Sequence, residues 1–316
     1  MIQNVAVLGV GGVGGYFGGK LCQKTNLNIS FIARGEHLRA IQENGLLLST
    51  DAEGDLVCKP TLATDRISAL PLPDLILLCV KEFDLRAVLL ELKPLIRERT
   101  IILPLLNGMD VYERIRRIIS AGVVLPACVY VGTHIERPGK VTQRGGACKI
   151  LFGPDPQYPD FNPDPVLRLF AEANIKSEWT HKVQEEIWTK FMFICAFGTV
   201  TAVHNKTVGE VVENATLRAE ADTIMHELVA LANASGVTLP SGVIDQSIAK
   251  GKAFPFETKT SFQRDFERAD KPDERNLFAG AVVSNAARLN VDVPKTRELL
   301  HKLNELKPQS LATARM

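Results

Sequence analysis

A glycine-rich turn near the beginning of the chain restricts its fold more than any other feature of the sequence. The run Gly9-Val10-Gly11-Gly12-Val13-Gly14 follows an apolar segment at 5–8 and precedes a helical pattern that begins at about Val13. A strand, a glycine turn and a helix in this order let the backbone approach a pyrophosphate, which the helix N-terminus stabilises. The alternative is a glycine turn that binds nothing, but the position between strand and helix favours the ligand. The turn therefore predicts a dinucleotide site formed by Gly9, Gly11, Gly12, Val13 and Gly14.

The end of the second predicted strand, 29–34, indicates which dinucleotide is bound. An NAD site usually has Asp or Glu about 20 residues after the glycines, where it accepts hydrogen bonds from the ribose 2′-OH. This chain has Arg34 there, and a guanidinium can pair with the 2′-phosphate of NADP. Glu36 can belong to the first turn of the next helix, where an acid is favourable. The sequence therefore predicts NADPH rather than NADH.

Length and composition narrow the class of protein. The 316 residues fit two domains of about 150 residues each, and an apolar fraction of 46% can form their cores. A net charge of +1 argues against nucleic acid and anionic membranes as partners. Apolar runs stay below the roughly 18 residues of a membrane span, and the first strand leaves no room for a signal peptide. The six cysteines include no C-x-x-C pair and are expected to be reduced thiols, so we predict a cytoplasmic protein.

The first half of the chain alternates strand-like and helix-like segments. Strands are predicted at 75–80, 100–104, 128–132 and 149–152, helices at 84–95 and 110–119, and turns at 138–139 and 145–146. Continuous apolar runs are typical of parallel strands that are covered on both faces. This alternation predicts an α/β fold with a Rossmann-type doubly wound parallel sheet.

The second half is predicted to be all helical. Its helices are expected at 184–201, 215–235, 241–252, 261–268, 275–289 and 295–306. We therefore expect an NADP-binding domain at 1–180 and a helical domain at 181–316 for the substrate and for a homodimer contact. Ligands of open α/β sheets bind at the carboxyl ends of the strands, so the active site is expected in the cleft between the domains.

Polar residues follow several of the predicted strands, where such a ligand would lie. They are Lys81 after Val80, Asn107-Gly108 after Leu103, and Gly132-Thr133-His134 after Val131. The helical half adds three further candidates: Lys190, Ser261 and Glu274.

Together these segments resemble the ketopantoate reductase (2-dehydropantoate 2-reductase) family over nearly the whole length. The resemblance rests on the glycine turn, Arg34, Val80-Lys81, Leu106-Asn107-Gly108-Met109, Trp188-Thr189-Lys190, 260–265 and Lys271-Pro272-Asp273-Glu274. It implies NADPH-dependent reduction of a small 2-oxo acid, with ketopantoate to pantoate as the default reaction. It also implies a role for each candidate. Lys190 is the catalytic lysine and contacts the substrate, Lys81 lies beside the nicotinamide end, Asn107 and Glu274 hold cofactor and substrate, and Ser261 contacts the substrate.

Lys190 also has a physical case that is independent of the resemblance. Hydride that arrives at a ketone carbon leaves an alkoxide, which needs charge stabilisation and a proton, and an ammonium supplies both. Partial burial lowers the pKa of an ammonium toward the operating range. The neighbours Trp188 and 191–195 are apolar. The alternative is an ordinary surface lysine on an amphipathic helix, which is the commonest environment of Lys.

Histidine is the rival acid–base group. His134, His181 and His204 have no carboxylate partner in the sequence pattern, and a lone histidine is more often structural. His134, which is expected on a loop after a strand, is the strongest rival. Residues with metal-ligand spacing do not cluster in the sequence, so no metal is expected.

Four positions depart from the family pattern. Where the family has asparagines that face the substrate, this chain has Ile194, Gly198, Val208 and Thr258. Because buried amides that bind a substrate hydroxyl carry specificity, their loss changes the preferred substrate. Ile194 and Gly198 are expected to leave space and apolar surface beside the lysine. Two alternatives to the default follow: a reductase of a more apolar 2-oxo acid, and an NADP-binding sensor without turnover. Retention of Lys190 and Glu274 favours an enzyme.

Overall fold

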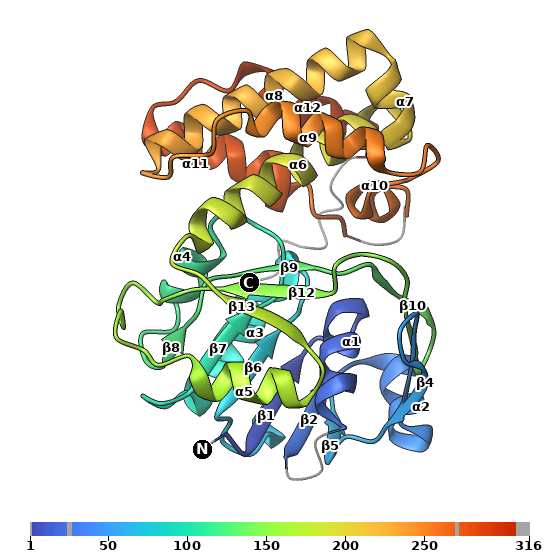
Figure 1. Cartoon of the computed structure of the whole chain (residues 1–316), viewed down its shortest axis with the longest axis vertical. Helices are drawn as coiled ribbons and strands as arrows, with labels where there is room; N and C mark the ends of the chain where they lie inside the picture. The colour runs from blue at the N-terminus through green and yellow to red at the C-terminus, as the bar shows by residue number, and fades with distance from the viewer. Residues whose placement is uncertain (1, 24–26, 269–271, 308–316) are drawn as a thin grey trace. The chain divides into compact units, whose positions relative to one another are not determined.

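The computed structural model describes residues 2–23, 27–268 and 272–307. The chain divides into two compact units, and the boundary falls between Val183 and Gln184. The first unit contains both strands and helices, and the described part of the second unit is helical (Figure 1). Residues 308–316, which the expected second domain includes, and Lys271, which belongs to a segment of the family resemblance, lie outside the described residues.

The first unit is built on a six-stranded sheet in the order β5-β2-β1-β6-β7-β8, and all its neighbouring strands are parallel. Its strands are β1 (Asn4–Leu8), β2 (Asn28–Ile32), β5 (Leu62–Thr64), β6 (Leu75–Leu78), β7 (Ile101–Pro104) and β8 (Val123–Val124). The chain first extends the sheet from β1 to β2 and β5, and then returns to the other side of β1 with β6. The expected Rossmann-type doubly wound sheet is therefore confirmed, and its order reverses at the carboxyl ends of β1 and β6.

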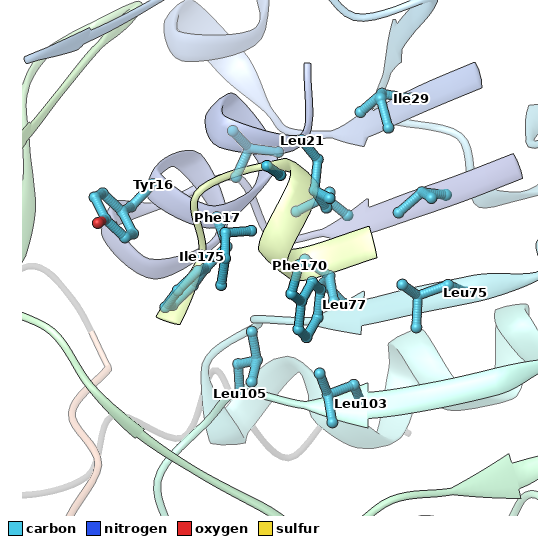
Figure 2. Close-up of a cluster of buried hydrophobic side chains, with 14 of the residues drawn as sticks. Tyr16, Phe17, Leu21, Ile29, Leu75, Leu77, Leu103, Leu105, Phe170 and Ile175 are labelled. Carbon is cyan, nitrogen blue, oxygen red and sulfur yellow. The ribbon is translucent and has the colours of Figure 1, made fainter. Parts of the chain in front are cut away.

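Helices cover both faces of this sheet because successive strand residues point to opposite faces. On one face, Phe17 and Phe170 pack with Leu75 and Leu77 in one apolar cluster (Figure 2). A second cluster on the other face includes Leu85. The helices of the first unit are α1 (Gly12–Leu21), α2 (Gly35–Asn44), α3 (Glu82–Leu92), α4 (Val111–Arg116) and α5 (Asp164–Glu172), with short turns of 3-10 helix at η1 (Ile67–Ala69) and η2 (Lys93–Leu95).

Two small sheets complete the first unit. One has the order β10-β11-β3-β4 and the other the order β13-β12-β9. Their strands are β3 (Leu46–Thr50), β4 (Gly54–Cys58), β9 (Ala127–Tyr130), β10 (Thr133–Arg137), β11 (Lys140–Gln143), β12 (Lys149–Phe152) and β13 (Lys176–Trp179). The turn expected at 138–139 joins β10 to β11, and Gly139 has a φ of +77°, which glycine adopts readily. Of the strands in these two sheets, only β9 and β12 were predicted from the sequence, and β5 and β8 of the main sheet were also not predicted.

The described part of the second unit contains the expected helices and one more. Its helices are α6 (Val183–His204), α7 (Val208–Glu213), α8 (Ala215–Ala234), α9 (Val243–Ala253), α10 (Ser261–Phe266), α11 (Ala281–Leu289) and α12 (Pro294–Leu306). The short helix α7 was not predicted. The segment expected as one helix at 275–289 begins with a turn of π-helix, η3 (Asn276–Gly280), and continues as α11.

Helix α6 is the most apolar of the long helices. By length and composition alone, it would suit a membrane span. In the structure, however, 72% of its 18-residue apolar window is buried. A core helix meets the same criteria, because a helix that is apolar all round can be buried in protein.

Candidate functional site

The glycine turn lies at the point where the strand order reverses. At three of its positions, the local geometry explains why the residue is a glycine. Gly9 has a φ of +89°, and an added Cβ would come within 2.8 Å of the Cys79 carbonyl oxygen. A Cβ on Gly14 would lie 2.3 Å from the Gly9 carbonyl oxygen. A Cβ on Gly11, by contrast, would meet no atom of another segment within 4 Å. Two glycines thus allow close packing of the turn, and Gly11 leaves its outer side open to a ligand.

This geometry fits a dinucleotide. Gly11 is the N-cap of α1 and provides no side-chain cap, so the first N–H groups of the helix are left without a side-chain partner from the cap. A pyrophosphate can approach a backbone that carries no Cβ and accept hydrogen bonds from such N–H groups. The residues present therefore suit the group that the sequence predicts.

Arg34 lies where the sequence places it, directly after β2 and before α2, and its side chain is 65% exposed. It has a partner that the sequence analysis missed: its Nη2 donates to Asp84 Oδ2 at 2.8 Å. Asp84 belongs to the first turn of α3, which follows β6. Glu36, as interpreted from the sequence, is in the first turn of α2. The guanidinium at this edge of the sheet is therefore already paired with a carboxylate.

The loops after β6 and β7 carry Lys81 and Asn107. Lys81 is exposed and is the N-cap residue of α3, and Asn107 is partly exposed. Arg114 of α4 joins the two segments, because it donates to Glu82 at 2.6 Å and to Asp110 at 2.9 Å. Glu82 directly follows Lys81, and Asp110 follows the loop that contains Asn107. The two ion pairs of Arg114 therefore hold both loops at the same edge of the sheet as the glycine turn.

His134 differs from its expected environment. It is an exposed residue inside β10, opposite Thr142 of β11, rather than a residue of a strand-end loop. Its neighbour Thr133 does lie against the glycine turn, because a Cβ on Gly12 would come within 2.8 Å of Thr133 Oγ1. The strand was missed because Pro138-Gly139, four and five residues after His134, closes a hairpin there.

In the second unit, Lys190 lies on the partly open face of α6. Glu186, Lys190 and Ile194 follow one another at helical spacing and are half-buried, whereas Phe191 and Trp188 are buried. The next position on this face is Gly198, where an added Cβ would meet the Phe262 ring at 3.4 Å. The space expected at Gly198 is therefore covered by Phe262, and of the two positions only Ile194 presents partly exposed apolar surface near Lys190.

The other departures from the family pattern meet in space. Val208 N donates to the carbonyl oxygen of Thr258 at 2.9 Å, although the two residues are distant in sequence. Val208 is buried and Thr258 is partly exposed. Ser261 is the first residue of α10 and is exposed. Gln263, which the sequence analysis did not single out, is 1% exposed, and neither polar atom of its side chain has a hydrogen-bond partner.

Glu274 is buried, with 3% of its surface exposed, and directly precedes the π-helical turn η3. Its neighbour Arg275 is anchored on both sides. Arg275 donates to Asp273 at 2.7 and 2.9 Å, and also to the carbonyl oxygens of Leu303 and Lys307 at the end of α12. Burial alone would raise the pKa of Asp273, but the hydrogen bonds and charge of Arg275 outweigh it and hold that pKa below its ordinary value.

His204 does have a carboxylate partner, which corrects the reading from sequence. Its Nε2 lies 2.8 Å from Glu220 Oε2 of α8. The histidine ends α6, 14 residues after Lys190, so the two Cα atoms are separated by about 21 Å along the helix. His181 is exposed and packs its ring edge-on against Trp179. Within the described ranges, His, Cys, Asp and Glu form no group of three or more that could hold a metal ion.

The chain matches known proteins along nearly its whole length. Residues 5–157 match the family described as ketopantoate reductase PanE/ApbA, and residues 182–307 match the C-terminal family of the same description. A 2-dehydropantoate 2-reductase of Mesorhizobium japonicum is 28% identical over 304 residues, which cover 89% of this chain and 90% of the relative.

Solved structures agree with this match. The crystal structure of a PanE/ApbA family ketopantoate reductase from Ralstonia eutropha has a TM-score of 0.87 and 28% identity, with coverage of 96% of this chain and 98% of that one. A D-mandelate dehydrogenase, solved with NADH and anilino(oxo)acetate, shares the fold with a TM-score of 0.81 at 19% identity, with coverage of 96% and 98%.

Proposed function

Because the chain belongs to the ketopantoate reductase family and is thus an oxidoreductase of that kind, we propose that it reduces a 2-oxo acid to a 2-hydroxy acid with NADPH. The default substrate is 2-dehydropantoate (ketopantoate). The observation that carries the proposal is the glycine turn at the switch point, where Gly9 and Gly14 pack closely and Gly11 is open. We assign residues 1–180 to the cofactor and residues 181–316 to the substrate and a homodimer contact, in the cytoplasm.

Residues of both units are proposed to hold the cofactor. They are Gly9, Gly11, Gly12, Val13, Gly14, Arg34, Lys81, Asn107 and Glu274. The glycine turn and the start of α1 bind the pyrophosphate, and Arg34 pairs with the 2′-phosphate. Lys81 and Asn107 follow the strands β6 and β7, where the ligand of a parallel sheet lies. The cofactor, when bound, supplies the hydride that is added to the ketone carbon.

Lys190 is the proposed general acid. The carbonyl oxygen of the substrate gains negative charge as its carbon is reduced, and the Lys190 ammonium stabilises that charge and donates a proton from Nζ. Its half-buried environment beside Phe191 and Trp188 excludes part of the water and strengthens this interaction. Asn107 and Ser261 are proposed to orient the substrate, since an amide and a hydroxyl can both bind a carboxylate or a hydroxyl.

One observation favours a more apolar 2-oxo acid over ketopantoate. Ile194 is half-buried on the same face of α6 as Lys190 and offers apolar surface where the family has an amide. The D-mandelate dehydrogenase that shares this fold was solved with the aryl-substituted acid anilino(oxo)acetate. We therefore propose that catalytic efficiency on ketopantoate is lower than on at least one apolar 2-oxo acid.

The decisive experiment measures nucleotide oxidation by the purified chain against a panel of 2-oxo acids that includes ketopantoate and aliphatic and aryl members. Turnover of one or more acids with NADPH supports the proposed reductase, and the ranking identifies the substrate class. Tight NADPH binding without turnover of any acid would favour the sensor instead. Absence of nucleotide binding would overturn both readings.

A further inference from the structure

The pair formed by Arg34 and Asp84 has a consequence for the choice between NADPH and NADH. The two side chains meet at 2.8 Å and are 65% and 31% exposed. Arg34 follows β2 and Asp84 lies in the first turn after β6, and these strands are the two neighbours of β1. The ion pair therefore lies at the carboxyl edge of the sheet, on which the glycine turn also lies.

A 2′-phosphate cannot form an ion pair with Arg34 without disturbing the ion pair between Arg34 and Asp84. The phosphate carries about −1.5 to −2 charges at neutral pH, and it must displace the carboxylate or share the guanidinium with it. In the shared arrangement two anions lie within a few ångströms of each other, which is unfavourable. In the displaced arrangement, the carboxylate loses its charged partner. Either way, the attraction that Arg34 offers to the phosphate is reduced.

The same carboxylate suits the unphosphorylated cofactor. A ribose 2′-OH can donate a hydrogen bond to Asp or Glu, and this is the usual arrangement in NAD sites. Those sites carry the acid at the end of the second strand, but here the acid comes from the helix after β6, 50 residues beyond Arg34. The ion pair thus offers the Arg34 guanidinium to a 2′-phosphate and the Asp84 carboxylate, as a hydrogen-bond acceptor, to a 2′-OH.

We propose that Asp84 is a cofactor-specificity residue, which competes with the 2′-phosphate for Arg34 and accepts the 2′-OH of NADH, so that the chain binds both cofactors with modest discrimination. This inference rests on the proposed nucleotide site. It goes beyond that proposal because it gives a role in binding NADH to Asp84, a residue to which the proposed function assigns no role.

The test is isothermal titration of the full chain with NADPH and with NADH, without substrate. Asp84→Asn keeps the size of the side chain and removes the charge, so we expect NADPH to bind about tenfold more tightly and NADH to bind equally or a few-fold more weakly. Arg34→Ala should weaken NADPH by about tenfold or more and affect NADH little. Glu91→Gln, which removes an exposed charge from the same helix α3, is the matched control and should change neither affinity.

The outcomes separate this inference from the function on which it rests. If the wild-type chain binds NADPH and Asp84→Asn leaves both affinities unchanged, Asp84 has no role in specificity, and the nucleotide site itself stands. If Asp84→Asn and Glu91→Gln strengthen NADPH binding equally, the effect is one of net charge and the inference is overturned. If neither nucleotide binds the wild-type chain, the proposed function and this inference both fail. Melting temperatures of the variants show whether each is folded.

Discussion

At the scale of single residues, Ile194 is the position at which substrate preference should be most easily changed. It lies one helical turn after Lys190 on the same half-buried face of α6. In Ile194→Asn an amide replaces apolar surface, so kcat/KM for ketopantoate, relative to an apolar 2-oxo acid, should rise by about tenfold. Ile194→Val retains the apolar surface and serves as the control. An equal ratio in the Asn and Val variants would show that this side chain does not contact the substrate.

Individual residues also show what a single sequence could and could not reveal. Arg34 was identified because its position after a strand is a local feature, but its partner Asp84 is 50 residues away and could not be paired with it from spacing. Gly198 was interpreted as open space because a glycine has no side chain. The ring that covers it, Phe262, comes from α10, and such tertiary contacts have no local signal.

At the scale of the βα turn, two glycine substitutions should separate folding from binding. Gly9→Ala introduces a Cβ at a positive φ and within 2.8 Å of the Cys79 carbonyl oxygen, so it should lower the melting temperature. Gly11→Ala meets no other segment, so the fold should persist, while nucleotide affinity falls by about tenfold or more because the Cβ occupies the ligand's approach. Thermal melting and titration with NADPH check the pair. Unchanged affinity in a folded Gly11→Ala variant would remove this turn from the cofactor site.

The anchoring of the segment before η3 to α12 gives a second prediction at this scale. Arg275 is 2% exposed and bonds Asp273 as well as the end of α12. Arg275→Met removes the guanidinium from the buried Asp273 carboxylate, which keeps only the backbone N–H of residue 275 and Lys307 nearby, and from the carbonyl groups at the end of α12. The free energy of unfolding should therefore fall by about 3–5 kcal/mol. Arg288→Met, on the exposed side of α11, should cost less than about 0.5 kcal/mol. Urea unfolding measures both, and equal losses would contradict the anchoring role.

The same ion pair should affect stability against acid. The pKa of Asp273 in the folded chain lies below its ordinary value, despite the opposing effect of burial. A depressed pKa contributes stability above the unfolded pKa of about 4, and this contribution is lost as the pH falls through the folded pKa. Urea unfolding at a series of pH values below about 4 should therefore show a smaller loss of stability in Arg275→Met than in the wild type.

Elements with a strong local pattern were predictable, and elements that depend on distant partners were not. The buried strands β1, β6 and β7 were found because apolar runs covered on both faces leave an unambiguous signal. The strand β13 has the sequence Lys-Ser-Glu-Trp and, among the described residues, pairs only with β12, so its pattern resembles a loop. Likewise β3 exists because β4 and β11 pair with it, and β11 is about 90 residues away in the chain.

At the scale of the whole molecule, the proposed mechanism places the contacts to the phosphates of the cofactor in one unit and the general acid in the other. The proposed pyrophosphate and 2′-phosphate contacts belong to the first unit, whereas Lys190 belongs to the second. Lys190→Ala should therefore lower kcat by about 10²–10⁴-fold, the usual effect of removing a general acid that also stabilises charge, and leave the Kd of NADPH within about twofold.

Two further variants separate the roles of Lys190. Lys190→Arg keeps the positive charge but cannot release a proton near neutral pH, so it should recover only the part of the rate that comes from charge stabilisation. Lys252→Ala removes an exposed lysine from α9 and should leave kcat unchanged. A lysine that only packs its stem against Trp188 and Phe191 would give the opposite result for Lys190→Ala, namely a lower melting temperature with normal turnover. Because kcat, NADPH affinity and melting temperature are measured on the same variant, that outcome would exclude Lys190 from the chemistry while leaving the nucleotide site of the first unit intact.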